Sequence, residues 1–258
     1  MLDVSYSLSG ALTGFVVGLT GVGGGALMMP LLLLLGVNPV TAVATDLWFA
    51  ALTKTVAAGI HGRAGQIDWG VVRRLWLGSL PVAVAVVLLV SLGARLQKLD
   101  WLGSAIGGVV LLTAFGLLLA PSLRAMARNN RIGNPARFLR WQPGLTVLAG
   151  AVIGLCVALT SVGAGALGSV LLLYLYPLRM TPHRLVATDI LHAIPLALVA
   201  GLGYLLAGQV DGWMLLSLLA GSLPAVLLGS LLSRRLNGRR LQVALALVLL
   251  AAGGKLLF

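Results

Sequence analysis

Hydrophobic residues follow one another along this chain in long runs, without the alternation or one-sided spacing typical of soluble domains. Uncharged stretches cover residues 75–94, 101–123, 190–210 and 212–233. Each is long enough to cross a bilayer, which takes about 20 residues in a helix. Because backbone groups in lipid must find partners within their own segment, we predict an all-α polytopic membrane protein.

Two further uncharged runs are too long for a single crossing. Residues 4–45 and 141–178 would each extend roughly 60 Å as straight helices, about twice the hydrocarbon thickness. A Gly-rich segment interrupts each run near its middle, at Gly21 to Gly25 and at Gly163 to Gly165. Each run is therefore either a helical hairpin that dips into the membrane or one broken, strongly tilted helix.

The chain contains an internal duplication. The residues TGVGGGAL from Thr20 return 140 positions later as TSVGAGAL from Thr160, and the block VATD that ends at Asp46 returns 143 positions later at Asp189. The blocks Gln-Ile-Asp and Gly-Ser-Leu-Pro of the first half also recur in the second half, with Val in place of Ile. Four blocks in one order indicate two repeats, and a duplicated, Gly-broken apolar chain is typical of a secondary transporter.

The distribution of Arg and Lys favours the hairpin interpretation. If each long run returns to the side it entered, nearly all cationic loop residues fall on one side of the membrane. If each run crosses once, they divide almost evenly. Membrane orientation thus accounts for the formal net charge of +12, and we expect no nucleic-acid partner. Cationic loops face the cytoplasm, which places the basic linker there and both termini on the periplasmic side.

The expected organisation follows from these patterns. Repeat 1 covers residues 1–121, the basic cytoplasmic linker covers 122–141, and repeat 2 covers 142–258. Each repeat would hold one Gly-broken helical hairpin and three transmembrane helices, about eight hydrophobic segments in all, with the full crossings near 39–62, 69–94, 99–121, 181–207, 212–233 and 238–258. Three is odd, so the second repeat would be inserted upside down relative to the first, and the two Gly-rich tips would approach each other near the midplane.

The Gly-rich breaks are the first candidates for ligand binding. A half-helix that begins after such a break presents free N–H groups and the positive end of its dipole, which attract an anion. Close helix packing is the simpler explanation for any single glycine, but duplication of the whole motif favours binding. The predicted substrate-binding residues are Thr20, Gly23, Gly24, Gly25, Thr45, Thr160, Ser161, Gly163, Gly165 and Thr188.

Four ionisable residues fall inside predicted spans, where a charge costs several kcal/mol and points to function by default. Asp46 and Asp189 follow the duplicated threonines, and each either couples transport to protons or caps the helix break of its own repeat. Lys54 lies about two turns after Asp46 and either attracts an anionic substrate or pairs with a carboxylate. His192 neighbours Asp189 on a helix and either shuttles protons or makes a simple polar contact.

The order and duplication of these motifs resemble the sulfite exporter TauE/SafE family of membrane transporters. The resemblance rests on Gly21-Val22-Gly23-Gly24-Gly25 followed by Pro30, on Ala44-Thr45-Asp46, on their second copies and on the basic central linker. It covers essentially the whole chain and implies about eight helices. It also implies transport of small sulfur-containing anions, such as sulfite, sulfoacetate or related sulfonates, across the bacterial inner membrane. Ser161 and Ala164 replace two glycines of the first copy, so the two half-sites need not be equivalent.

We therefore expect a secondary transporter that works by alternating access, with proton coupling, in the inner membrane. Its predicted partners are the lipid bilayer and a small anionic substrate, with no cofactor and no metal. Two alternatives remain open at this stage, an anion channel that uses the same site and a membrane scaffold that transports nothing. The sequence contains no Gly-x-Ser-x-Gly, His-Glu-x-x-His or Cys/His cluster, so we do not expect an enzyme.

Overall fold

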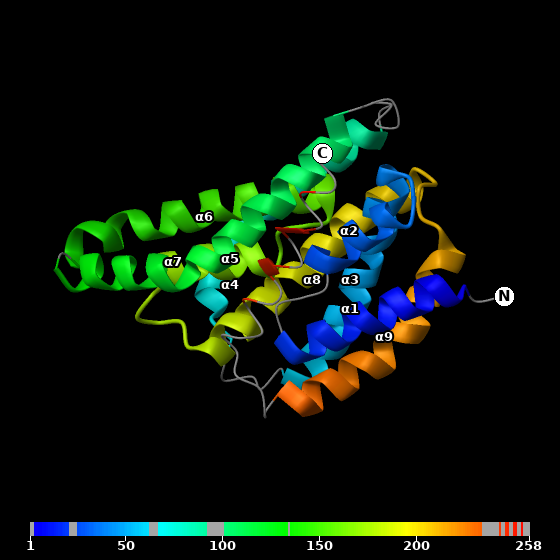
Figure 1. Ribbon diagram of the computed structural model, residues 1–258. Coiled ribbons are helices and arrows are strands. Elements are labelled where there is room, and N and C mark those ends of the chain that lie inside the picture. The colour runs from blue at the N-terminus through cyan, green and yellow to red at the C-terminus, as the bar shows by residue number, and fades with distance from the viewer. Residues whose placement is uncertain are drawn as a thin grey trace.

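The computed structural model describes residues 3–20, 25–61, 67–91, 101–133 and 135–233, with single positions at 243, 246, 247, 250, 251 and 254. Every element of the described ranges is a helix, as predicted (Figure 1). The helices are α1 (Val4–Thr20), α2 (Gly25–Leu34), α3 (Pro39–His61), α4 (Trp69–Ser91), α5 (Trp101–Gly133), α6 (Pro135–Thr160), α7 (Ala166–Leu175), α8 (Pro182–Leu206) and α9 (Gly212–Ser233). Most of the predicted span 238–258 lies outside the described residues.

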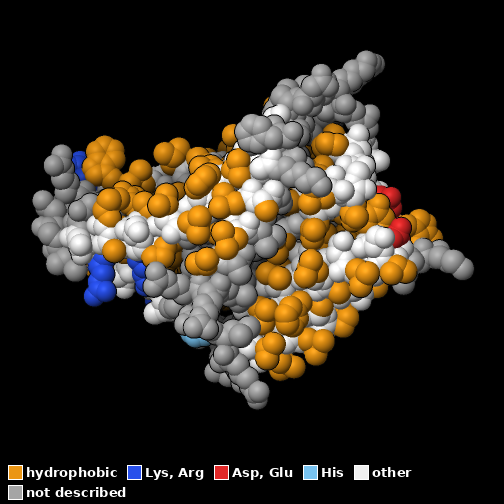
Figure 2. Space-filling model, in the orientation of Figure 1, with side chains coloured by type: hydrophobic (Ala, Val, Ile, Leu, Met, Phe, Trp, Pro, Cys, Tyr) orange, Lys and Arg blue, Asp and Glu red, His pale blue; other side chains and the backbone are white. Residues whose placement is uncertain are grey.

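The described helices include several that suit a bilayer. Segments of α4, α6, α8 and α9 are long and apolar enough to cross a membrane, and α5 supplies a fifth candidate if its two parts, bent by 52°, form one span. Hydrophobic side chains are spread over the described part of the face seen in Figure 2, on which few charged side chains appear. A surface of this kind is unfavourable in water and favourable against lipid. The chain is therefore a multi-pass membrane protein.

The connection between the repeats is more helical than the sequence predicted. We expected the span to end at residue 121 and a linker to occupy 122–141, but α5 continues to Gly133 and α6 begins at Pro135. The residues after Pro121 are rich in Leu, Ala, Met and Arg, which favour helix. Arg side chains can reach water from a helix end. The charges that marked a linker are therefore compatible with two helices that extend beyond the apolar layer.

The two repeats start their equivalent helices with equivalent caps. Asn38 accepts a hydrogen bond from the N–H of residue 40 at the start of α3, and Thr181 accepts one from the N–H of residue 184 at the start of α8. At the start of α4, Asp68 Oδ1 accepts a hydrogen bond from the N–H of residue 71 at 3.4 Å, and at the start of α9, Asp211 Oδ1 accepts one from the N–H of residue 214 at 2.9 Å. Such side chains satisfy N–H groups that a helix start leaves without a partner. The duplication in sequence therefore produces the same local structure twice.

Glycines allow the first helix of each repeat to pack closely against a helix of the other repeat. A Cβ atom added to Gly14 on α1 would lie 2.5 Å from the carbonyl oxygen of Ser222 on α9, and one added to Gly154 on α6 would lie 2.5 Å from that of Ser79 on α4. Gly14 and Gly154 are equivalent in the duplication, as are Ser222 and Ser79. The same backbone approach thus occurs twice, with the repeats exchanged, in the manner of small-residue contacts between membrane helices.

Helices α3 and α8, which correspond to each other in the two repeats, pack against each other in opposite directions. The indole Nε1 of Trp48 donates a hydrogen bond to the carbonyl oxygen of Gly201 at 3.0 Å. Further along α3, Lys54 interacts instead with Asp189, near the start of α8. Residue numbers therefore rise along α3 while they fall along α8, and the pair is antiparallel.

Candidate functional site

The helix break that the sequence predicted in the second repeat lies between α6 and α7. Ser161, Gly163 and Gly165 adopt positive φ angles of 57°, 126° and 119°, and Gly165 is the N-cap of α7. Glycine enters this backbone region at little cost, whereas a side chain makes it strained. Ser161 is the one described residue other than glycine with a positive φ. Strain of this kind is typical of functional sites.

Helix α7 folds back along α6. The Nε2 atom of Gln142 donates to the carbonyl oxygen of Leu175 at 2.7 Å, and the hydroxyls of Thr146 and Tyr176 lie 2.7 Å apart. The end of α7 thus returns to the beginning of α6, so this long run is a hairpin and not one tilted helix.

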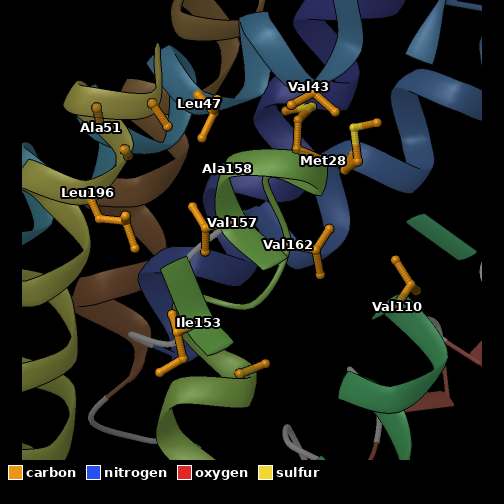
Figure 3. Packing of buried hydrophobic residues seen from close by; sticks show 14 of the residues in the cluster. Met28, Val43, Leu47, Ala51, Val110, Ile153, Val157, Ala158, Val162 and Leu196 are labelled. Carbon is orange, nitrogen blue, oxygen red and sulfur yellow. The ribbon is translucent and has the colours of Figure 1, made fainter. Parts of the chain in front are cut away.

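The corresponding break of the first repeat falls between α1 and α2. Helix α1 ends at Thr20 and α2 begins at Gly25, two of the residues predicted to bind substrate. Gly23 and Gly24 lie outside the described residues. The tip of the second hairpin is packed in the core beside α2 and α3 (Figure 3), where Val157 and Val162 lie near Met28 and Val43. All four side chains are buried, so a polar group at this tip is shielded from water.

A buried cation lies at the break between α6 and α7. Lys54 of α3 is 2% exposed, and its Nζ donates a hydrogen bond to the carbonyl oxygen of Ala164 at 3.1 Å. The carboxylates of Asp46 and Asp189 both interact electrostatically with this ammonium group. Within the described ranges, neither comes within 4.0 Å of it. The ammonium group is therefore held between two carboxylates without a direct ion pair.

Two polar groups beside Lys54 face each other but form no hydrogen bond of good geometry with the described residues. The hydroxyl of Ser161 faces the carboxylate of Asp46, but neither Ser161 Oγ nor either oxygen of Asp46 forms a hydrogen bond of good geometry. Asp46 is 0% and Ser161 4% exposed. Buried polar groups in native proteins are nearly always satisfied. Unpaired groups at a strained helix break, next to a buried cation, therefore mark a candidate binding site.

Asp189 has a different environment from Asp46, although the two are equivalent in the duplication. Its carboxylate accepts a hydrogen bond from the backbone N–H of Gly165, the N-cap of α7. A Cβ atom added to Gly168 would lie only 2.5 Å from Asp189 Oδ1. The carboxylate thus lies against the first turn of α7, where the helix dipole favours negative charge.

Three predicted threonines make hydrogen bonds within the protein. Thr45 Oγ1 accepts from the backbone N–H of Asp211 at 3.2 Å, and Thr188 Oγ1 accepts from that of Asp68 at 3.1 Å. Each of these threonines fixes the start of a helix in the other repeat. Thr160 Oγ1 donates to the carbonyl oxygen of residue 156 at 2.6 Å. Thr160 therefore uses its hydroxyl proton within α6, whereas Thr45 and Thr188 accept in their bonds and each keeps an O–H that can donate to a ligand.

His192 belongs to the same buried region but is hydrogen-bonded to another helix. Its Nε2 lies 2.9 Å from Ser79 Oγ on α4, and its Nδ1 has no partner. The side chain is 0% exposed. In the duplication, the position of His192 corresponds to Phe49, and that of Lys54 to Ala197. Both groups thus occur in one repeat only and make the site chemically asymmetric.

The structure adds an ion-paired cluster that the sequence analysis did not assign to a role. Asp68 is 2% exposed, and its carboxylate lies 2.6 and 2.9 Å from two nitrogens of Arg179 and 3.3 Å from Arg184. The duplicated Gln-Ile-Asp block marked Asp68 and Asp211 as important. Nothing in that block predicted the two arginines. Arg179 lies in the segment between α7 and α8, and Arg184 lies in the first turn of α8. In the first repeat, Gly36 and Thr41 stand at their equivalent positions.

Asp68 is expected to contribute more to stability than its equivalent Asp211, because it pairs with two arginines in addition to capping a helix. We predict that Asp68→Ala lowers the free energy of unfolding by about 2–3 kcal/mol. Asp211→Ala should remove mainly a cap, which is worth about 1 kcal/mol. Thermal unfolding of both variants in detergent measures the difference. Equal losses would show that the arginine pairs contribute nothing to stability.

The fold and this site define the class of the protein. It is a multi-pass helical membrane protein in which a broken helix and buried ionisable side chains meet within the membrane-spanning body. The particular family follows from comparison with known sequences. The family model for the sulfite exporter TauE/SafE matches residues 6–256, and the chain belongs to this family.

Curated relatives cover nearly the whole chain. "Probable membrane transporter protein YjnA" of Bacillus subtilis (strain 168) is 37% identical over an alignment of 265 residues, which covers 99% of this chain and 100% of the relative. "Probable membrane transporter protein YdhB" of the same organism is 26% identical over 96% of this chain and 97% of its own length. No solved structure matches the chain significantly. The resemblance derived from the Gly-rich and Thr-Asp motifs is thus confirmed.

Proposed function

We propose that this protein is a secondary transporter that moves small sulfur-containing anions, such as sulfite, sulfoacetate or related sulfonates, across the inner membrane by alternating access. The basic connection between the repeats faces the cytoplasm and both termini face the periplasm. The family description names a sulfite exporter, and the relatives are named as probable membrane transporters. Proton coupling is part of the proposal, because ionisable groups within membrane helices are costly and typical of proton pathways.

The observation that carries the proposal is the buried polar cluster at the break between α6 and α7. An anion placed there would meet the Lys54 ammonium group and the unpaired Ser161 hydroxyl. It would also approach the first turn of α7, where the N–H groups of Gly168 and Ser169 already donate to the carbonyl oxygens of Gly163 and Gly165, so only the N–H groups before them could bind it. Gly163 and Gly165 leave the backbone at this point uncovered. These donors suit an oxyanion better than a cation or an uncharged solute.

An inverted-topology repeat is the arrangement we propose for the two halves. The antiparallel packing of α3 against α8 supports it, since equivalent helices point in opposite directions when one repeat is upside down. The exchanged glycine contacts support it as well. In Figure 1 the start of α6 and the start of α1 lie at opposite sides of the view. Inverted repeats with a site between them are typical of transporters that alternate access by moving one part against another.

Flux of labelled sulfite into proteoliposomes tests the proposed function. We expect saturable uptake that a proton gradient alters and that excess unlabelled sulfonates inhibit. Unlabelled sulfite on the far side should stimulate exchange, which a channel does not show. Absence of flux for sulfite and the sulfonates, in protein shown to be folded, would contradict this function.

Ser161 is expected to contribute directly to anion affinity, whereas its neighbour Thr160 is not. A hydrogen bond to a charged group contributes about 1.5–3 kcal/mol, so Ser161→Ala should raise the apparent KM for the anion by roughly 10–100-fold. Thr160→Val is the control, because the Thr160 hydroxyl is bonded to the backbone of α6. It should change KM by less than about twofold while lowering stability by about 1 kcal/mol. Equal KM values for Ser161→Ala and the wild type would place the anion elsewhere.

A further inference from the structure

The two duplicated aspartates are equivalent in sequence but differ in their surroundings. Asp189 lies against the first turn of α7 and accepts the N–H of Gly165. Asp46 is fully buried and faces the Ser161 hydroxyl, but neither of its oxygens forms a hydrogen bond of good geometry, whereas in Asp189 this is true of Oδ2 alone. An ionised carboxylate is stable in such surroundings only when it is paired and hydrogen-bonded. The surroundings of Asp189 therefore support an ionised carboxylate better than those of Asp46.

The sequence contains a reason for this difference. Asp189 can approach α7 because residue 168 is glycine, where any Cβ atom would lie 2.5 Å from its Oδ1. In the first repeat the equivalent position, 140 residues earlier, is Met28, whose side chain is completely buried. A methionine at this position carries a side chain where Gly168 has none, so the first turn of α2 offers a carboxylate less room than the first turn of α7.

The groups around Asp46 limit how its charge can be balanced. Lys54 lies on the same helix, and Ser161 faces Asp46 from the break between α6 and α7. Helix α8 contributes Asp189 and His192, of which His192 is bonded to Ser79. Helices α2 and α9, which also pack against α3, contain no titratable residue. One ammonium group thus faces two carboxylates, and an incoming anion would be repelled if both were ionised.

We propose that Asp46 carries the proton that accompanies each transported anion, and that Asp189 stays with Lys54 and holds the start of α7. The inference rests on the proposed function and assigns its coupling to one residue. Protonation of Asp46 removes a negative charge beside Ser161 and Lys54, so the anion can bind there. Release of the proton restores the charge and favours release of the anion. Anion and proton therefore move together in the same direction.

The decisive experiment compares Asp46→Asn with Asp189→Asn in proteoliposomes. The asparagine of Asp46→Asn imitates the protonated acid, so anion exchange by this variant, whatever its rate, should no longer depend on pH. The variant should lose accumulation driven by a proton gradient. Asp189→Asn should retain gradient-driven accumulation in the fraction that remains folded. Gradient-driven accumulation by Asp46→Asn, or its loss in Asp189→Asn alone, would overturn the assignment.

A second measurement needs no transport and separates this inference from the proposed function. In the folded wild type, ionisation of an unpaired buried carboxylate is unfavourable, whereas in the unfolded chain it is not. The thermal midpoint in detergent should therefore fall as the pH rises. Asp46→Asn should abolish this fall and raise the midpoint at high pH. Asp189→Asn and Gly168→Ala should each lower the thermal midpoint, but in both variants the midpoint should still decrease as the pH rises.

The two measurements together give clear outcomes. If the wild type transports none of the tested anions but its midpoint behaves as expected, the proposed function fails and the difference between the two aspartates stands. If Asp46→Asn and Asp189→Asn change the pH dependence of the midpoint equally, the two residues have not diverged and the inference fails. Accumulation driven by a sodium gradient and insensitive to protons would also overturn it.

Discussion

Gly78→Ala and Gly221→Ala are each expected to disrupt the contact between the two repeats. A Cβ atom at Gly78 on α4 would overlap the carbonyl oxygen of Val147 on α6, and one at Gly221 on α9 would overlap that of Ser7 on α1. Backbone atoms cannot move aside as the end of a side chain can, so each pair of helices must separate. We expect each variant to lose about 3 kcal/mol of stability. That loss would lower the thermal midpoint in detergent by roughly 6–12 °C.

Gly59→Ala and Gly144→Ala are the matched controls for this prediction. Both glycines lie in helices, and an added Cβ atom at either position has nothing within 4 Å. Alanine favours the helix over glycine by up to about 1 kcal/mol, so both controls should be neutral or slightly stabilising. Gly78→Ala or Gly221→Ala with a midpoint equal to the controls would contradict the close approach of the helices.

The equal effect expected at Gly78 and Gly221 has a structural meaning. The two positions are equivalent in the duplication, and so are their partners Val147 and Ser7. Each contact joins a helix of one repeat to a helix of the other. Small residues at these places permit van der Waals contact between backbones, which is a main source of helix association in lipid. The conserved spacing of the two halves thus reflects one packing arrangement used twice.

Much of the fold could be predicted because it depends on local patterns. The long apolar runs indicated the helices, the crossings expected near 39–62 and 181–207 agree with α3 and α8, and the glycines from Gly163 to Gly165 marked the break before α7. We expected a crossing to end near residue 121 and assigned no secondary structure to the linker 122–141, in which α5 continues to Gly133 and α6 begins at Pro135.

The site could be predicted only in part, because burial and pairing depend on contacts between distant helices. The sequence singled out Thr45 and Thr188 as ligand donors, but their bonds to Asp211 and Asp68 depend on how the repeats pack. The carbonyl partner of Lys54, Ala164, lies 110 residues away. The different surroundings of Asp46 and Asp189 likewise follow from tertiary contacts, although the Met28 and Gly168 pair recorded the difference in the sequence.

Lys54→Met is expected to be the most damaging change at the site. It removes the cation that faces Asp46 and Asp189 and leaves the carbonyl oxygen of Ala164 without its donor. Breaking a buried charged arrangement by removing one partner costs about 3–5 kcal/mol, because the remaining charge is uncompensated. We therefore expect a large fall in the thermal midpoint and loss of anion flux. Leu52→Met, at a partly exposed position of the same helix, should leave both unchanged.

Double variants identify which carboxylate the Lys54 cation compensates. If Asp189 is ionised and Asp46 protonated, Lys54→Met combined with Asp189→Asn should recover much of the lost stability, whereas the combination with Asp46→Asn should recover little. The coupling free energy from such a cycle is expected to be about 2–3 kcal/mol for the first pair. Recovery of stability without recovery of flux would separate the structural role of Lys54 from its role in holding the anion. Equal recovery by both combinations would mean that the two carboxylates share the cation. The thermal midpoints of the wild type, the three single variants and the two double variants decide between these cases.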